Sequence, residues 1–321
     1  MLAETYTDGF LVLHDGAIVT ERYLDGMDEG DTHLLMSCSK SVTSLLLGAL
    51  WGQGLLSTDD LVTDHLPELA GTAWDGCRLQ HVLDMRAGVD WDFDVDEYTI
   101  LDVSDYRTHD LHGTIPADTE TWLRTIAPGP YPHGAGPFRY CSLATDVLGW
   151  VAARAGGGTF AEVLSRELWS RIGAEQDAAI LVDHRGFAIV EGGICTTLRD
   201  LARVGLMCLD DGRTPDGQVV PAEWIARVRV DDRDLLEAYA TSPIITDPPP
   251  GAFYHDCWWV ADGPRGVYHA LGMNGQSLFI HRPARTAIAK LSTFPDALDW
   301  DRFALHLAGM TALCEWLATS R

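Results

Sequence analysis

Hydrophobic and polar residues alternate along the first part of the chain and then change to a helical spacing. Residues 10–26 read FLVLHDGAIVTERYLDG, with apolar residues alternating on both sides of Asp15-Gly16. Asp-Gly is a favoured two-residue turn, so this pattern predicts a β-hairpin. Residues 39–54 (SKSVTSLLLGALWGQG) begin with serines, become apolar and end in glycines. That order predicts a helix with a start signal and a stop signal.

The middle of the chain shows mainly a helical pattern, and the part after it shows mainly a strand pattern. From about residue 55 to 240, apolar positions recur mainly at helical spacing between loops rich in Asp, Gly and Pro. After the prolines of 247–251, the pattern predicts strands within 253–262, 276–281 and 286–294. A last helix is expected because five apolar residues share one face at helical spacing: Phe303, Leu307, Met310, Cys314 and Leu317.

Together these elements predict an α/β (α+β) fold in a single domain, residues 1–321. Segments from both termini, about 1–55 and 250–321, are expected to form one lobe, an antiparallel sheet with flanking helices. A mostly helical lobe of about 56–249 would be inserted between them. A cleft between two lobes is a favoured place for a ligand site.

Composition and charge narrow the classes of function. Hydrophobic residues make up 46% of the chain and charged residues 22%, which is typical of a globular protein. The formal net charge of −24 repels nucleic-acid phosphates and anionic lipids, so we expect no nucleic-acid partner and no membrane partner. The longest apolar run, 45–51, is too short to cross a bilayer, and the N-terminal residues do not resemble a signal peptide.

The seven cysteines are scattered along the chain, without a C-x-x-C pair or the spacing of a zinc site. We therefore expect reduced, mostly buried thiols in a cytoplasmic protein, with no metal and no cofactor.

Lysine use points to candidate chemistry. Lys40 and Lys290 are the only lysines among the 23 basic residues, and the others are arginines. Ser37 lies three residues before Lys40. Residues three apart on a helix share a face, so the Ser37 hydroxyl and the Lys40 amine should meet. A lysine whose pKa is lowered toward neutrality can take a serine proton, whereas arginine stays charged. From this motif alone, a plain helix cap at Ser37 beside a solvated Lys40 is an equal alternative.

Two other stretches could complete such a site. Residues 137–150 (PFRYCSLATDVLGW) place Tyr140 just before a predicted helix, with Ser142 two residues on. Residues 268–283 (YHALGMNGQSLFIHRP) form a glycine-rich turn leading into a strand, where a backbone N–H could face the cleft. A phenol can pass a proton to a leaving group, and an N–H can stabilise an oxyanion.

In order and spacing, the three blocks resemble the serine β-lactamase and penicillin-binding-protein superfamily. The likeness runs from about residue 10 to 295 and is closest to class C-like esterases and 6-aminohexanoate-dimer (nylon-oligomer) hydrolases. Ser37-Cys38-Ser39-Lys40 is similar to the first motif and Tyr140-Cys141-Ser142 to the second. At the third motif, where lactamases carry Lys-Thr-Gly, this chain has Ala270-Leu271-Gly272, so efficient β-lactamase activity is not expected.

The resemblance implies a serine hydrolase that cleaves an amide or ester bond of a small molecule through an acyl-enzyme. Ser37 would attack the carbonyl, Lys40 would take or relay its proton, and Tyr140 would pass a proton to the leaving group. The N–H groups of Ser37 and Met273 would form the oxyanion hole. Further substrate-binding residues implied in the cleft are Ser142, Glu191, Gly272 and Asn274.

Acidic residues crowd the segment VDWDFDVDEY at 89–98. A calcium loop of the EF-hand type starting at Asp90 would need Gly at 95 and Glu at 101, where the chain has Val95 and Leu101. Asp92 or Asp94 could instead pair with a substrate ammonium. The alternative is an acidic, solvated loop at the rim of the cleft.

Other interpretations stay open at this point. An acyltransferase would use the same acyl-enzyme with another acceptor, and a non-catalytic binding module could share the fold. A Ser-His-Asp hydrolase has less support because no serine lies in a G-x-S-x-G motif. Of the two histidines beside the third motif, His269 could line the cleft, while His281 is expected at a solvent-facing strand end. A homodimer is an open option for assembly.

Overall fold

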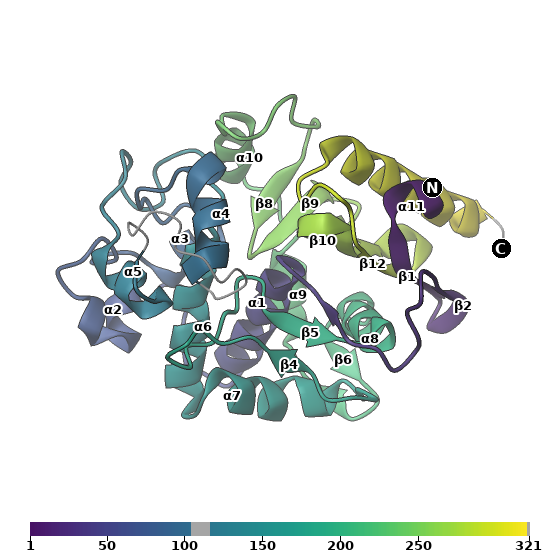
Figure 1. The fold of residues 1–321 in the computed structure, drawn as a ribbon, viewed down its shortest axis with the longest axis horizontal. Coiled ribbons are helices and arrows are strands. Elements are labelled where there is room, and N and C mark those ends of the chain that lie inside the picture. The colour runs from purple at the N-terminus through teal and green to yellow at the C-terminus, as the bar shows by residue number, and fades with distance from the viewer. Residues whose placement is uncertain (104–115, 320–321) are drawn as a thin grey trace.

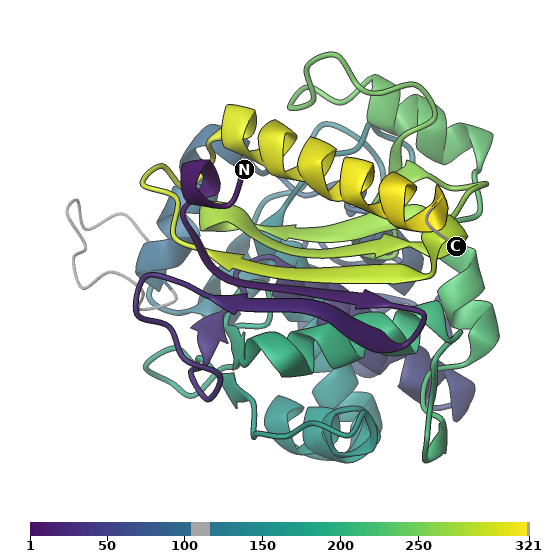
Figure 2. The ribbon, with the colours of Figure 1, turned by 90° about the vertical axis from the view of Figure 1, so that its right-hand side faces the viewer.

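The computed structural model describes residues 1–103 and 116–319, and its centre is a seven-stranded antiparallel sheet (Figures 1 and 2). The strand order is β2-β1-β12-β11-β10-β9-β8, so two strands from the start of the chain join five from its end. The strands of this sheet are β1 (Thr7–His14), β2 (Ala17–Tyr23), β8 (Phe253–His255), β9 (Trp258–Asp262), β10 (Val267–Gly272), β11 (Gln276–His281) and β12 (Thr286–Ser292). Two smaller sheets contain β3 (His33–Leu34), β4 (Ala179–Ile180) and β5 (Ile194–Thr196), and β6 (Arg213–Thr214) with β7 (Gly217–Gln218).

Most of the helices lie in the middle of the chain. The described α-helices are α1 (Cys38–Gly52), α2 (Val62–His65), α3 (Leu79–Leu83), α4 (Phe93–Val103), α5 (Thr119–Thr125), α6 (Ser142–Gly156), α7 (Phe160–Glu167), α8 (Leu198–Leu209), α9 (Ala222–Arg227), α10 (Arg233–Ala240) and α11 (Trp300–Thr319). Short 3₁₀ turns lie at Ala3–Thr5, Pro67–Leu69, Trp169–Arg171, Met273–Gly275 and Arg282–Ala284. The predicted fold class is confirmed, whereas the lobe boundaries at about residues 55 and 250 stay a proposal.

The predicted N-terminal hairpin is confirmed. Strands β1 and β2 pair antiparallel on either side of Asp15 and Gly16. Both turn residues have positive φ angles, 48° and 81°, as the favoured two-residue hairpin turn requires. Asp-Gly predicts this turn correctly because both residues readily adopt the positive φ angles that the turn requires.

The strand expected within 253–262 is instead two strands, β8 and β9, joined by a tight turn at Asp256 and Cys257. Both turn residues have positive φ angles, 49° and 63°. Neither residue is glycine, so the sequence carries no ordinary hairpin signal here. The turn is held from outside, because the Cys257 N–H donates to the Leu83 carbonyl and the Cys257 carbonyl accepts from the Ser41 hydroxyl.

Helices cover both faces of the large sheet (Figure 2). Helix α11 lies across one face, where Met310, Cys314 and Leu317 pack with apolar residues of β1, β11 and β12. Helix α8 lies on the opposite face, against β1, β11 and β12. The helix expected at the end of the chain is thus confirmed, with its predicted apolar face toward the sheet.

Helix α1 is the central helix of the fold and packs against α6 and β10 (Figure 1). Thirteen of its fifteen residues are buried. Contact with α9 is so close that a Cβ at Gly48 would lie 2.5 Å from the Trp224 indole. This packing fixes the N-terminal end of α1 beside the end of β10.

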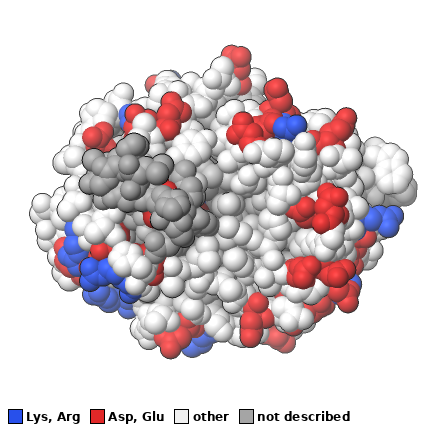
Figure 3. Space-filling model, viewed as in Figure 1, with Lys and Arg blue, Asp and Glu red and all other residues white. Residues whose placement is uncertain are grey.

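The surface is acidic, as the composition indicates. Acidic side chains are spread across the face shown in Figure 3, whereas basic side chains gather mainly near its edges. Both lysines of the chain are buried, so arginine supplies the basic side chains of the surface. All seven cysteines are unpaired and six of them are buried. Among the described residues, no helix combines the length and the apolar character needed to span a membrane.

The two histidines beside the third motif lie away from solvent. His281 is 1% exposed, and its Nδ1 accepts a hydrogen bond from the Ala284 N–H, so the expectation of a solvent-facing position is wrong. His269 is buried on the α11 face of the sheet, stacked near Phe279 with ring centres 5.9 Å apart.

Candidate active site

Ser37 lies at the point where the chain turns sharply into α1. Leu35 is tied to Ile194 by a backbone hydrogen bond, and Met36 then adopts a left-handed conformation with φ of 48°. Ser37 occupies the N-cap position, but its side chain makes no capping hydrogen bond. Instead its Oγ accepts a hydrogen bond from Lys40 Nζ at 2.8 Å. The geometry therefore favours the serine–lysine pair over a plain helix cap.

Lys40 is completely enclosed, with 1% of its surface exposed. Its Nζ donates to the Glu191 carbonyl at 2.7 Å and lies 3.7 Å from the Glu191 carboxylate. It also lies 4.9 Å from the centre of the Tyr140 ring. These contacts and the Ser37 hydroxyl surround the amine with oxygen atoms and an aromatic face.

The protonation of Lys40 differs from the sequence expectation of a lowered pKa. Burial alone would lower the pKa of this amine, but the carboxylates of Glu191 and Glu97, and Tyr140 whenever it is ionised, together raise it above its ordinary value. Lys40 therefore stays protonated at neutral pH. The pKa differs from the expectation because the carboxylates come from segments more than 50 residues away in sequence, which the S-x-x-K motif does not reveal.

Glu191 is held in place by another buried acid, Asp146 of α6. Asp146 Oδ1 accepts from the N–H groups of Val190 and Glu191 at 2.9 and 3.1 Å. Burial, reinforced by the charge of Glu191, raises the pKa of the Asp146 carboxyl well above its usual range. Burial also raises the pKa of Glu191, against the effect of the Lys40 ammonium. Glu191, expected from the sequence to bind substrate, thus contacts the Lys40 amine and does not line the pocket, and its part in substrate binding stays a prediction.

Tyr140 lies two residues before α6 and faces Ser37 and Lys40. Its ring stacks on Trp259 of β9, with ring centres 5.6 Å apart and planes 21° from parallel. Burial raises the pKa of the Tyr140 phenol to about 12, although the Lys40 charge and hydrogen bonding with Ser37 and Lys40 act in the opposite direction. The phenol is therefore protonated at neutral pH and can donate a proton.

Glu97 of α4 is a pocket residue that the sequence analysis did not select. Its carboxylate accepts hydrogen bonds from the Trp91 indole N–H at 3.1 Å, the Ser142 N–H at 2.9 Å and the Ser142 hydroxyl at 2.7 Å. Burial raises the pKa of Glu97 to about 7, although Lys40 and Ser142 favour the charged form. The sequence did contain a signal for this position. Glu97 lies three residues before Ile100, on the apolar face of the helix that packs inward, where an acid is unusual.

The neighbouring acids Asp92 and Asp94 are exposed and do not line the pocket. The Asp92 carboxylate accepts from the Asp94 N–H at 3.0 Å, and the Asp92 N–H donates to Asp96 at 2.8 Å. These bonds shape the first turn of α4. The role of Asp92 or Asp94 in binding a substrate ammonium remains a prediction.

The turn after β10 lies against the segment that carries Ser37. A Cβ at Gly272 would lie only 2.5 Å from the Leu35 carbonyl oxygen and 3.0 Å from Met36 Cβ, so a larger residue would push β10 away. Asn274 is left-handed with φ of 58°, and its side-chain amide donates to the Phe294 carbonyl at 2.8 Å. Gly272 therefore permits the close approach, while Asn274 ties the turn to the strand end behind it.

A pocket of about 540 Å³, including its open mouth, lies between these segments. It brings together Ser37, Tyr140, Glu97 and the Gly272–Met273 turn, and the rest of its described wall is apolar. The apolar lining residues are Phe93, Ile244, Ile245, Trp259, Leu271, Leu298, Trp300 and Phe303. In the turns and loops that the structure describes, the Asn274 N–H is engaged by the Ala297 carbonyl, but neither the Ser37 nor the Met273 N–H donates such a bond. The pocket can therefore hold an acyl group beside a serine hydroxyl.

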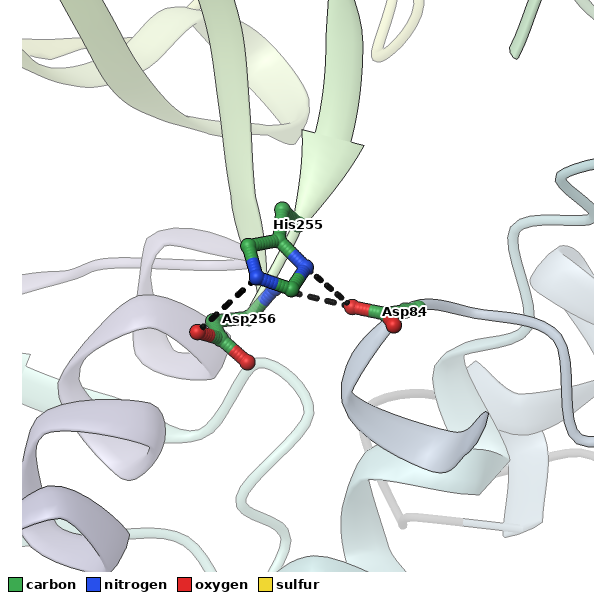
Figure 4. A group of neighbouring side chains, drawn as sticks. All are labelled: Asp84, His255 and Asp256. Carbon is green, nitrogen blue, oxygen red and sulfur yellow. Dashed lines mark hydrogen bonds and ion pairs between the residues drawn. The ribbon is translucent and has the colours of Figure 1, made fainter. Parts of the chain in front are cut away.

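A second polar cluster lies at the β8–β9 turn (Figure 4). His255 Nδ1 lies 2.7 Å from Asp84 and its Nε2 3.4 Å from Asp256, whose carboxylate also pairs with Arg227 at 2.8 Å. Burial lowers the pKa of His255, but the two carboxylates outweigh it and raise the pKa to about 9. Two cations thus balance two anions, and both imidazole nitrogens are engaged. This arrangement is an ionic clamp that holds the turn before Trp259.

Comparisons with known sequences find matches over most of the chain. The family model described as Beta-lactamase matches residues 4–306. A 6-aminohexanoate-dimer hydrolase from Paenarthrobacter ureafaciens is 38% identical over 303 residues, which cover 92% of this chain and 74% of the relative.

Solved structures share the fold at lower sequence identity. A Bacillus anthracis protein provisionally described as a 6-aminohexanoate-dimer hydrolase has a TM-score of 0.84 and 23% identity, covering 97% of this chain and 81% of its own. EstCE1, described as a hydrolase with promiscuous acyltransferase activity, has a TM-score of 0.71 and 17% identity, covering 96% and 94%.

Proposed function

The chain belongs to the beta-lactamase family, and on that premise we propose that it hydrolyses amide or ester bonds through an acyl-enzyme on Ser37. The observation that carries the proposal is the 2.8 Å hydrogen bond between Lys40 Nζ and Ser37 Oγ, located at the wall of an apolar pocket. A serine hydroxyl needs such a partner to lose its proton as it attacks a carbonyl.

In the proposed acylation step, Ser37 Oγ bonds to the substrate carbonyl carbon and its proton moves to Lys40. Because Lys40 already carries three protons, it passes one of them to Tyr140, which passes its own to the leaving nitrogen or oxygen. The net transfer takes one proton from Ser37 to the leaving group, and Lys40 begins and ends protonated. Lys40 is thus a relay rather than a free base.

The negative charge that develops on the carbonyl oxygen needs hydrogen-bond donors on the other side. We assign this role to the N–H groups of Ser37 and Met273, which both line the pocket. In the second step, the relay runs in reverse: an incoming water attacks the acyl carbon and gives a proton to Tyr140, which passes its own proton through Lys40 to Ser37 Oγ as the ester bond breaks. An added amine or alcohol would divert the same intermediate to acyl transfer.

For the substrate, we propose a small amide or ester whose apolar part lies against the pocket wall. Ala270-Leu271-Gly272 lacks the lysine and threonine that lactamases use at this position, so penicillins are poor candidates. The 38% identical relative is described as acting on 6-aminohexanoate dimers, which makes this amide the first compound to test.

The test combines turnover with detection of the intermediate. The protein is incubated with p-nitrophenyl esters of increasing acyl length and with the 6-aminohexanoate dimer, then quenched and analysed by mass spectrometry. We expect hydrolysis of at least one substrate and an acyl adduct on the peptide that contains Ser37.

Ser39→Ala is the matched control for Ser37→Ala, because Ser39 is a neighbouring serine whose buried hydroxyl accepts from the Ile194 N–H. The adduct should persist in Ser39→Ala and vanish in Ser37→Ala. The absence of turnover and of any adduct across the series would favour a binding module on this fold.

A further inference from the structure

Helix α6, which follows Tyr140, begins without a capping side chain of its own. Cys141 occupies the N-cap position and makes no side-chain capping bond. Glu97, 45 residues earlier, takes this place by accepting from both the N–H and the hydroxyl of Ser142. A carboxylate is favourable there because the first N–H groups of a helix carry partial positive charge.

Glu97 is also part of the pocket wall, although it is only 2% exposed. Several ionisable groups face it: Lys40 from α1, Glu191 from the segment before β5, and Tyr140 and Cys141 from the start of α6. Lys40 is the only cation among these groups. A change of charge on Glu97 therefore acts directly on the proton relay.

The hydrogen bonds of Glu97 suit its ionised form. All three come from donors, the Trp91 indole and the two groups of Ser142. A proton on the carboxyl oxygen that faces the Ser142 hydroxyl would meet another hydrogen, so the hydroxyl would have to rotate and accept instead of donate. Protonation thus replaces charge-assisted hydrogen bonds with weaker neutral ones at the start of α6, two residues from Tyr140.

We propose that Glu97 is a positioning residue, whose ionised carboxylate holds the start of α6 and thereby Tyr140 in the arrangement that passes the proton to the leaving group. This inference rests on the proposed function. It assigns to a residue outside the three recognised motifs the task of keeping the relay aligned.

A pH dependence follows from the burial of this carboxyl. Since burial raises the pKa of Glu97 to about 7, against Lys40 and Ser142, the ionised form is lost as the pH falls through that value. We therefore expect kcat to fall below about pH 7 and to level off above it.

The decisive variant is Glu97→Gln, which keeps the size of the side chain and removes its charge. The amide oxygen can still accept from Trp91 and the Ser142 N–H, while the amide nitrogen donates to the Ser142 hydroxyl. At alkaline pH we expect about a tenfold or larger loss of kcat, little change in KM, and a profile that no longer bends near pH 7.

Asp96→Asn is the matched control, because Asp96 is the adjacent carboxylate of α4 but does not line the pocket. Its kcat and its pH profile should equal those of the unaltered protein. Both variants are assayed with one p-nitrophenyl ester from about pH 5.5 to about pH 9, with circular dichroism to check folding.

Ser142→Ala provides a second measurement should Glu97→Gln not fold. Loss of the hydroxyl removes a donor that favours the charged carboxylate, so the bend in the profile should move to higher pH. An unmoved bend in Ser142→Ala, or a bend retained in Glu97→Gln whatever its kcat, would overturn the proposal. Failure of the unaltered protein to turn over any ester or form an adduct would instead overturn the proposed function.

Discussion

The chain contains two lysines, and both lie buried beside a serine hydroxyl. Lys40 donates to Ser37, and Lys290 of β12 contacts the hydroxyl of Ser292. Their exposed fractions are 1% and 0%. By residue type and immediate partner the two sites are alike, so their differences show what turns a buried lysine–serine pair into a candidate active site.

The first difference is electrostatic. Lys40 has Glu191 at 3.7 Å and also interacts with the charge of Glu97, whereas Lys290 has no ion pair among the described residues. Besides Ser292, Lys290 donates to the Thr5 carbonyl at 3.2 Å and lies 5.1 Å from the Phe294 ring centre. Burial therefore lowers the pKa of Lys290 to about 7, although Asp8 acts against it, while the pKa of Lys40 is raised.

Two buried histidines, His306 and His269, lie on the same side of the sheet as Lys290. Burial lowers the pKa of His306 to about 2 and that of His269 to about 4, and the charge of Lys290 adds to the effect on His306. Neither ring nitrogen of His306 has a hydrogen-bond partner among the described residues. This side of the sheet, under α11, therefore disfavours positive charge.

The second difference is access. Ser37 lines an open pocket, whereas Ser292 is 0% exposed. Lys290 has the lowered pKa that the sequence analysis required of Lys40, yet no substrate can reach its serine. A lowered lysine pKa is thus not sufficient for such a site, because Lys290 has one and its serine is inaccessible. Nor does the candidate site have one, because the pKa of Lys40 is raised. We therefore associate function with a lysine that lies between acids, as Lys40 does between Glu191 and Glu97, and whose serine opens onto a pocket.

The largest expected effect contrasts the two serines. Ser37→Ala should lower kcat by at least about 10³-fold, because the group that forms the covalent bond is lost. Ser292→Ala should change kcat by no more than about twofold, since its hydroxyl is sealed under α11. Ester hydrolysis by both variants is the measurement. If both variants lost kcat to a similar extent, the assignment of catalysis to the Ser37–Lys40 pair would be wrong.

The next effect contrasts the two lysines through stability. The pKa of folded Lys290, about 7, lies below its unfolded value of 10.5, so the unfolded chain binds more protons between these values. Stability therefore rises with pH across this window, and the full penalty is present below about pH 7. Lys290→Met should raise the free energy of unfolding by about 1–3 kcal/mol at pH 7 and by almost nothing above pH 10.5.

Lys40→Met is the matched variant in that experiment. It leaves Glu191 and Glu97 without their cation, so the free energy of unfolding should fall by about 3 kcal/mol near neutral pH. Urea unfolding at several pH values measures both changes. If the two methionine variants shifted stability in the same direction, the electrostatic contrast between the sites would be wrong.

The smallest expected effect concerns a third, partly buried cation, His255 in the ionic clamp. Its folded pKa of about 9 exceeds the ordinary 6.5, so its stabilisation is complete below pH 6.5 and is lost as the pH rises through 9. His255→Gln should lower the free energy of unfolding by about 1–2 kcal/mol at pH 6 and have little effect above about pH 10. At low pH His255→Gln thus lowers the free energy of unfolding, whereas Lys290→Met raises it. Thermal unfolding of both variants at several pH values measures the two changes. A change of the same sign in both would contradict the prediction.

Much of the fold could be predicted from local patterns. Asp15-Gly16 marks a hairpin because its residues suit the turn backbone, and the spacing of Met310, Cys314 and Leu317 marks the buried face of α11. The β8–β9 turn could not be predicted. Asp256 and Cys257 are held in left-handed conformations by tertiary contacts that no local pattern encodes.

The candidate site shows the same limit. The spacing of Ser37 and Lys40 on one helix predicts their contact, which the structure shows at 2.8 Å. The raised pKa of Lys40 could not be predicted, because it depends on acids from distant segments. Glu97 was missed because it ends a run of acidic residues whose other members are largely solvated, and only its helical phase places it inward.

The burial of both lysines has a practical consequence for labelling and for self-modification. Within these 321 residues no side-chain amine reaches solvent, since Lys40 and Lys290 are each at most 1% exposed. Activated esters commonly acylate surface amines as a side reaction, but here they meet arginines, which stay protonated and do not act as nucleophiles. Apart from the α-amine of Met1, which is not buried, the surface therefore offers no amine to such an ester, and an acyl group found on the peptide that contains Ser37 reports on the pocket.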